Sequence, residues 1–225
     1  MACQPAPTAS RGSGDQKTGA LRFLALGDSY TIGEAVPPEG AWPRQLAAAL
    51  GSAGFRFDPV RIIARTGWTT DELAAAMDQA ELGGCYDLVS LSVGVNNQFR
   101  GRSVEEYRGQ YRDLLSRAIG LADGDVRRVL VLSIPDWSAS PFARTTDRDL
   151  AAEAAGMRAF NRAMAEETRA RGVDWLDITP STLDMTNDPS LVAEDGLHPS
   201  AELYRRWVAQ IADSVARRLQ SLACP

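Results

Sequence analysis

The chain alternates between short apolar runs and longer segments in which apolar residues recur every three or four positions. The runs have the length of buried strands, and the periodic segments have the pattern of amphipathic helices. We predict strands over residues 21–26, 60–64, 87–93, 126–134 and 173–178. We predict helices over residues 42–50, 70–77, 103–119, 149–171 and from Pro199 onward. The last helix carries one apolar stripe, Leu203, Trp207, Ile211 and Val215.

This alternation predicts an α/β fold, because strands that alternate with helices form a parallel sheet covered on both faces. The run over residues 87–93 is almost continuously apolar, as expected for a strand buried on both faces. Right-handed crossovers then give a three-layer α/β/α sandwich of about five parallel strands, a flavodoxin-like arrangement. The chain shows no internal repeat, and we predict one catalytic domain over residues 21–225.

Residues 1–20 differ in composition from the rest, with proline and glycine among serine, threonine and alanine. We interpret them as a flexible tether. The start Met1-Ala2-Cys3-Gln4 resembles that of a mature bacterial lipoprotein, in which a lipid on Cys3 would tether the protein to a membrane. That interpretation places the protein in the periplasm or at the cell surface. The alternative is an uninformative N-terminal segment on a cytoplasmic protein.

Composition excludes several classes of function. Lys and Arg total 24 against 29 acidic residues, and the net charge of −5 does not suit a nucleic-acid-binding protein. No apolar run approaches the ~18 residues that span a bilayer. Cys3, Cys85 and Cys224 are scattered and make no metal-binding spacing with His198, the only histidine. We therefore expect no metal and no cofactor.

Short polar motifs follow the predicted strands. Gly27-Asp28-Ser29 follows the first, Thr66-Gly67 the second and Gly94-Val95-Asn96-Asn97 the third. Since ligands bind beyond the carboxyl ends of parallel strands, these motifs should meet at one edge of the sheet. Alone, Gly-Asp-Ser is a common turn sequence. Together with a late Asp195-Gly196-Leu197-His198, it supplies the parts of a hydrolytic triad.

On these motifs the chain, from about Leu21 to the last helix, resembles the SGNH hydrolases, also called the GDSL esterase/lipase family. The resemblance implies that Ser29 is the nucleophile, His198 the general base and Asp195 the residue that orients the imidazole. It also implies an oxyanion hole made by the backbone N–H groups of Ser29 and Gly67 and the side-chain amide of Asn96. Donors fixed in this way stabilise the charge that develops on the substrate oxygen.

The family pattern is Gly-x-Asn-Asp, whereas this chain has Asn97 in the last place. The departure leaves Asn96 intact and changes only support for the loop, where an amide can also form hydrogen bonds. Asp28, beside the serine, is interpreted as holding the turn.

Aromatic residues after the strands, Trp68, Trp137 and Phe142 with Phe99, could wall an acyl pocket or pack in the core. The leading hypothesis is a cofactor-free serine esterase for carboxylic esters with acetyl or other short acyl groups. A lysophospholipase, thioesterase or carbohydrate acetylesterase of the same family, an acyltransferase, and a binding module that has lost hydrolysis remain alternatives. A phosphate-binding flavodoxin-like protein is disfavoured, because the chain has no Gly-rich phosphate loop. The sequence leaves the oligomeric state open.

Overall fold

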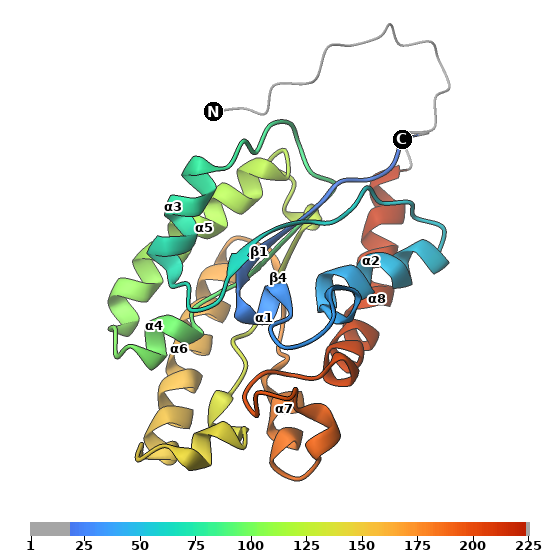
Figure 1. Ribbon diagram of the computed structural model, residues 1–225. Coiled ribbons are helices and arrows are strands. Elements are labelled where there is room, and N and C mark those ends of the chain that lie inside the picture. The colour runs from blue at the N-terminus through green and yellow to red at the C-terminus, as the bar shows by residue number, and fades with distance from the viewer. Residues whose placement is uncertain (1–18, 224–225) are drawn as a thin grey trace, which may run out of the picture.

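A computed structural model describes residues 19–223 (Figure 1). The predicted tether, with Cys3, falls almost wholly outside these residues. The strands are β1 (Phe23–Asp28), β2 (Arg61–Arg65), β3 (Leu88–Ser92), β4 (Val129–Leu132) and β5 (Asp174–Leu176). The α-helices are α1 (Ser29–Ile32), α2 (Trp42–Ser52), α3 (Thr70–Gln79), α4 (Val95–Phe99), α5 (Val104–Leu121), α6 (Leu150–Ala170), α7 (Thr179–Leu183) and α8 (Ala201–Ala223).

The five strands form one parallel sheet in the order β2-β1-β3-β4-β5. Helices α2 and α8 pack against each other on one face, and α3, α5 and α6 cover the other (Figure 1). This is the predicted three-layer sandwich. After β1 the chain moves to β2 at one edge, and after β2 it crosses back to β3 on the other side of β1. The gap between the ends of β1 and β3 is the point where such sheets bind ligands.

Burial explains why the predicted strands form here. Every residue of β1, β3 and β4 is buried, so these strands carry the continuous apolar character of a covered parallel sheet. The predicted apolar stripe of α8 is confirmed, since each of its members is at most 2% exposed. Strand β1 runs through Gly27 to Asp28, two residues beyond the predicted end, and thereby delivers Ser29 to the edge of the sheet.

Among the boundaries that differ from the prediction, two have a clear local cause. The fourth strand is shorter than expected, because Asp125 accepts a hydrogen bond from Arg127 N and residues 126–128 form a 3₁₀ turn. Pro199 does not begin the last helix. It pairs with Val192 in an isolated antiparallel bridge, and the helix starts at Ala201 after Ser200. The backbone carbonyl of Ser200 accepts from Tyr204 N at 3.1 Å, the first turn of the helix.

Gly94, in the loop after β3, packs closely against neighbouring side chains. Its φ is +136°, and a Cβ there would lie 2.6 Å from the Tyr107 ring and 2.7 Å from Ile134 Cδ1. Both the backbone conformation and the space therefore require glycine.

We expect Gly94→Ala to lower the free energy of unfolding by about 3 kcal/mol or more, because overpacking adds to backbone strain. Gly101→Ala is the matched control, since Gly101 also has positive φ (+70°) but nothing within 4 Å of an added Cβ. That variant should lose only about 1 kcal/mol. Urea unfolding of both variants measures the difference, and equal losses would show that the close packing at Gly94 is unimportant.

Candidate active site

Ser29 is the first residue of α1, directly after β1, and is 4% exposed. The Asp28 side chain caps this short helix by accepting from Tyr30 N at 3.1 Å. The helix ends after one turn at Gly33, whose φ of +76° lets its N–H donate to Ser29 O. The hydroxyl of Ser29 is thus presented by a strand–turn–helix at the carboxyl edge of the sheet.

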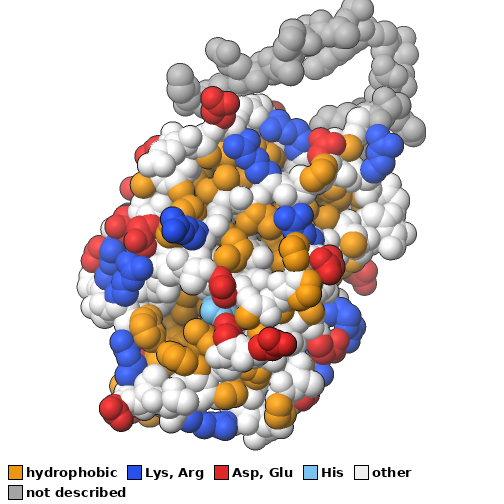
Figure 2. Space-filling view, viewed as in Figure 1, with side chains coloured by type: hydrophobic (Ala, Val, Ile, Leu, Met, Phe, Trp, Pro, Cys, Tyr) orange, Lys and Arg blue, Asp and Glu red, His pale blue; other side chains and the backbone are white. Residues whose placement is uncertain are grey.

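The loop before α8 brings His198 to Ser29 from the other end of the chain. His198 Nε2 lies 3.0 Å from Ser29 Oγ, and His198 Nδ1 lies 2.5 Å from Asp195 Oδ2. The second carboxylate oxygen, Asp195 Oδ1, accepts from Leu197 N at 2.9 Å and from His198 N at 3.0 Å. One carboxylate therefore holds both the backbone of the loop and the imidazole ring. Figure 2 shows part of this imidazole at the surface, beside hydrophobic and acidic side chains.

The charge state of Asp195 follows from these contacts. Partial burial raises the pKa of its carboxyl group, but hydrogen bonds from the His198 ring and from the backbone N–H groups of His198 and Leu197 outweigh burial. The pKa of Asp195 is therefore below its usual value, and the group is ionised at neutral pH. An ionised carboxylate accepts the Nδ1–H of His198 and leaves Nε2 free to accept the hydroxyl proton of Ser29.

Tyr30 also belongs to this site, although sequence reasoning did not select it. Its ring is 3% exposed and lies 4.9 Å, centroid to centroid, from the His198 ring. The contact limits the space in which the imidazole can rotate. Its position directly after Ser29 was the only available signal.

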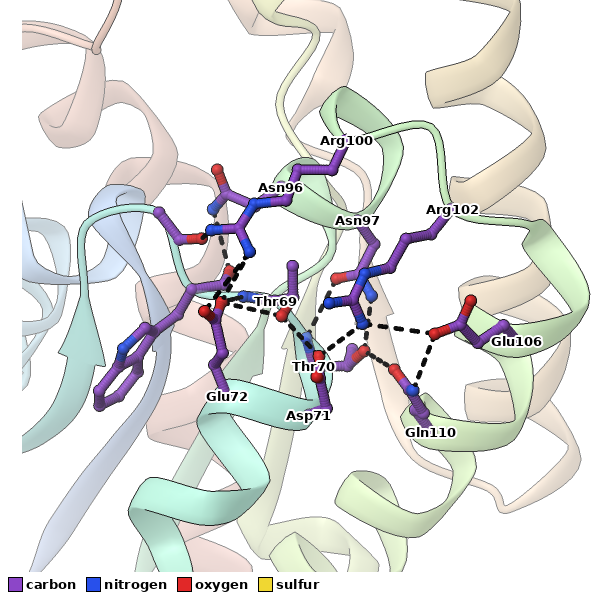
Figure 3. Close-up of polar contacts among 12 residues, drawn as sticks. Thr69, Thr70, Asp71, Glu72, Asn96, Asn97, Arg100, Arg102, Glu106 and Gln110 are labelled. Atoms are coloured by element: carbon purple, nitrogen blue, oxygen red, sulfur yellow. Dashed lines mark hydrogen bonds and ion pairs between the residues drawn. The ribbon is translucent and has the colours of Figure 1, made fainter.

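Gly67 follows β2 and Asn96 follows β3, the two strands that flank β1. Gly67 has φ +82°, and its backbone N–H has no hydrogen-bond partner among residues 19–223. Asn96 Nδ2 donates to the Trp68 carbonyl at 2.9 Å (Figure 3). Because a side-chain amide has two N–H groups, one remains for another acceptor. The loop that carries Gly67 and the side chain of Asn96 are thus held together.

Asn97, the departure from the family pattern, supports the same loop. It is fully buried; its Oδ1 accepts from Thr70 N at 3.0 Å, and its Nδ2 donates to Thr70 Oγ1 at 2.7 Å. The expectation that an amide can form hydrogen bonds at this position is confirmed. Figure 3 shows Asn97 beside the start of α3, within a larger set of polar contacts between α3, α4 and α5.

The predicted pocket residues do not share one environment. Trp137 is 2% exposed and donates from Nε1 to Gln98 Oε1 at 3.1 Å. Phe99 contacts Trp137 edge-on at 5.1 Å between centroids, and Phe142 lies 6.5 Å from it. Phe142 N donates to Gly196 O at 2.9 Å, which places this residue beside the Asp195–His198 loop. Trp68 is half-buried and packs against the core.

Asp28 is a buried carboxyl group at the centre of the site's scaffold. It is 2% exposed, and burial raises the pKa of Asp28 to about 7, although N–H groups of Tyr30 and Gly94 that donate to it act in the opposite direction. The carboxyl group thereby joins the serine turn to the loop after β3, as its predicted role of holding the turn requires.

Within residues 19–223, no group of three or more His, Cys, Asp and Glu side chains is placed to hold a metal ion. No helix within these residues is long and apolar enough to cross a membrane.

Residues 25–206 match the GDSL-like lipase/acylhydrolase family, and the chain belongs to that family. No curated protein matches the sequence. The protein is a hydrolase of this family with the α/β/α fold of its structural neighbours.

Three solved structures illustrate the likeness. A lipolytic G-D-S-L family protein from Veillonella parvula superposes with a TM-score of 0.65 at 16% identity, over 88% of this chain and 100% of that one. The acetylxylan esterase Axe2 from Geobacillus stearothermophilus gives 0.64 at 19% identity, over 90% and 96%. The psychrotrophic esterase EstA from Pseudoalteromonas sp., in a structure inhibited by monoethylphosphonate, gives 0.61 at 16% identity, over 88% and 98%. At these identities the likeness shows the fold alone.

The raised pKa of Asp28 predicts how stability depends on pH. The folded protein holds this proton up to about pH 7, whereas an unfolded chain loses it near pH ~3.9. Between these values the folded state binds more protons, so the contribution of Asp28 to stability falls as pH rises. We expect the melting temperature of Asp28→Asn, relative to wild type, to increase between pH 5 and pH 8. Asp213→Asn is the control at an exposed position of α8, and a pH-independent difference for Asp28→Asn would contradict the shift.

Proposed function

We propose that the protein is a serine esterase that hydrolyses carboxylic esters through an acyl-enzyme. The observation that carries this proposal is the continuous hydrogen-bonded chain from Ser29 Oγ through the His198 ring to the Asp195 carboxylate. Nucleophile, base and orienting carboxylate in hydrogen-bond contact are what ester hydrolysis by serine requires.

In the first half-reaction, Ser29 Oγ attacks the ester carbonyl carbon while His198 Nε2 takes the hydroxyl proton. The tetrahedral intermediate then expels the alcohol, to which His198 returns the proton. Water attacks the resulting acyl-enzyme in the same way, with His198 again as the base, and the acid leaves. Asp195, ionised throughout, stabilises the imidazolium formed in each step.

The negative charge on the former carbonyl oxygen requires donors that are in place beforehand. The N–H of Ser29 begins a helix and therefore has no acceptor in a preceding turn. The unpartnered N–H of Gly67 and the second N–H of the Asn96 amide complete the set. We assign these three groups to the oxyanion hole.

The esterase activity is tested first by Ser29→Ala, which should lower kcat on p-nitrophenyl acetate by about 10⁴- to 10⁶-fold with an unchanged melting curve. Ser52→Ala, at an exposed position of α2, is the matched control and should keep wild-type activity. An alkyl fluorophosphonate should also phosphonylate Ser29, with loss of HF, in the wild type and in Ser52→Ala but not in Ser29→Ala. Turnover above a few per cent in Ser29→Ala would rule out this serine as the nucleophile.

Assays of the wild type with different substrates and acceptors separate the alternatives. A binding module without hydrolysis would leave the wild type inactive on every ester, although its fold is intact. An acyltransferase would pass the acyl group to an added alcohol in preference to water, which product analysis in the presence of glycerol detects. Lysophospholipid, acyl thioesters and acetylated sugars distinguish the other activities of the family.

We further propose that the enzyme prefers acetyl or other short acyl groups. Trp137 lies beside both Phe99 and Phe142 and joins them into one aromatic group next to the site. Trp137 is almost completely buried, so little space remains behind this group for a long acyl chain. An acyl chain gains roughly 0.8 kcal/mol for each CH₂ only where a groove buries it. The acetylxylan esterase among the structural neighbours is compatible with a small acyl group.

On p-nitrophenyl esters, kcat/KM should therefore fall from acetyl or butyryl to decanoyl, because a longer chain has no space beside the buried Trp137 and gains nothing from methylenes that stay in water. Phe142→Ala should move the optimum towards longer chains by opening the side next to Gly196. Leu183→Ala, at an exposed position of α7, is the control that should leave the profile unchanged. A steady rise of kcat/KM from acetyl to decanoyl would contradict the preference and favour a lipase or lysophospholipase.

A further inference from the structure

The backbone of residues 67–70, between β2 and α3, carries one proposed oxyanion donor, the Gly67 N–H. Side chains from neighbouring elements hold this segment. The Gly67 carbonyl accepts from Arg100, the Trp68 carbonyl accepts from Asn96, and Thr70 N donates to Asn97. Thr69 N donates to Glu72 in the capping box of α3. Each residue of this segment thus has its own side-chain contact, and three of the four contacts come from α4 and its C-terminal residue (Figure 3).

Arg100 stands out in this set because it binds the residue that bears the donor. It follows α4, one helical turn after Asn96, and its Nη2 donates to Gly67 O at 2.6 Å. Its Nη1 lies 3.3 Å from Glu72 Oε2, and Glu72 in turn accepts from Thr69 N at 2.8 Å. One guanidinium therefore joins the glycine to the first turn of α3.

The geometry points to Arg100 as a positioning residue that fixes the direction of the Gly67 N–H in the oxyanion hole. The carbonyl and the N–H of Gly67 flank the same Cα, and a glycine rotates there more freely than any other residue. Fixing the carbonyl with a charge-assisted bond restricts that rotation and so aims the N–H. The inference rests on the proposed esterase activity and extends it to a residue outside the triad.

If Arg100 had only a structural role, its removal would lower the stability of the fold. Its side chain is 43% exposed and that of Glu72 is 40% exposed, so their ion pair is screened by water and contributes little to stability. The bond to Gly67 should therefore affect the reaction far more than it affects folding. A donor that acts on the developing oxyanion changes kcat and leaves KM almost unchanged.

Arg102 provides a matched control two residues away. It is also an arginine paired with acidic residues, through Asp71 at 2.7 Å and Glu106 at 3.3 Å, but it makes no contact with Gly67. Arg100→Met and Arg102→Met remove the same charge from the same surface. A fall in kcat that occurs in Arg100→Met and not in Arg102→Met is the effect expected from loss of the bond to Gly67.

The experiment measures kcat and KM on p-nitrophenyl acetate and inhibition by phenylboronic acid, whose tetrahedral serine adduct places an oxygen in the oxyanion hole. We expect Arg100→Met to lower kcat about 10- to 100-fold with KM within about twofold of wild type, and to weaken boronic acid inhibition similarly. Arg100→Lys should lie in between, because an ammonium group cannot donate to Gly67 O and Glu72 in the same fork geometry. Arg102→Met should match wild type in both measurements, and the urea midpoints of the two methionine variants should agree.

An active wild type with unchanged kcat in Arg100→Met would overturn the positioning role while leaving the esterase proposal intact. A rise in KM alone would also overturn it, because Arg100 would then bind substrate in the ground state. Equal losses of activity in Arg100→Met and Arg102→Met would assign the effect to surface charge and overturn it as well. A wild type that hydrolyses no ester would overturn the proposed function, and the inference would fall with it.

Discussion

The register of β1 against its two neighbours is the constraint on which the site depends. In this parallel sheet Asp28 pairs with Arg65 on β2, and Gly27 pairs with Ser92 on β3. Ser29 therefore leaves the sheet at the same level as the turn that reaches Gly67 and the loop that reaches Asn96. Since parallel strands present their carboxyl ends at one edge of the sheet, formation of the sheet itself brings these three loops together. Shifting the register by one residue would turn every side chain of β1 to the opposite face.

Close packing then converts this alignment into a fixed geometry. A Cβ at Gly27 would lie 2.5 Å from the Ser92 carbonyl, so β1 and β3 approach each other more closely at this point than larger residues allow. The buried Asp28 carboxyl group spans the same gap, with N–H donors from Tyr30 on one side and Gly94 on the other. The burial that raises its pKa also ensures that water does not compete for these bonds. The serine turn is thereby fixed to the loop that follows β3.

Sequence patterns were sufficient for the features that depend on local periodicity or on a short motif. They predicted the five strands and the edge at which the motifs meet. They missed α1, because a four-residue helix has no periodicity to detect. They also misplaced the start of α8, since Pro199 fits a helix start but is needed in the bridge to Val192 that closes the Asp195–His198 loop. The contacts of Arg100 with Gly67 and of Tyr30 with His198 join residues that only the fold brings together, and the one sequence signal for Tyr30 is its position directly after Ser29.

The two sides of the reacting centre are held in different ways, and this difference bears on how such enzymes vary. Ser29 and His198 are held by a strand end, a helix start and a tight loop, all of which are tied to the buried core. The segment 67–70 is held by side chains from α3, from α4 and from Arg100 after it, and those of Arg100 and Glu72 are at least 40% exposed. Exposed side chains can change without disturbing the core, so the side of the proposed oxyanion donors can be retuned while the proposed triad stays in place. Structural neighbours that share the fold at 16–19% identity show how far the rest of the sequence can diverge on this scaffold. Substrate choice should therefore be sought in the loops at the carboxyl edge of the sheet, where residues such as Phe142 and Arg100 border the site, and not in the sheet itself.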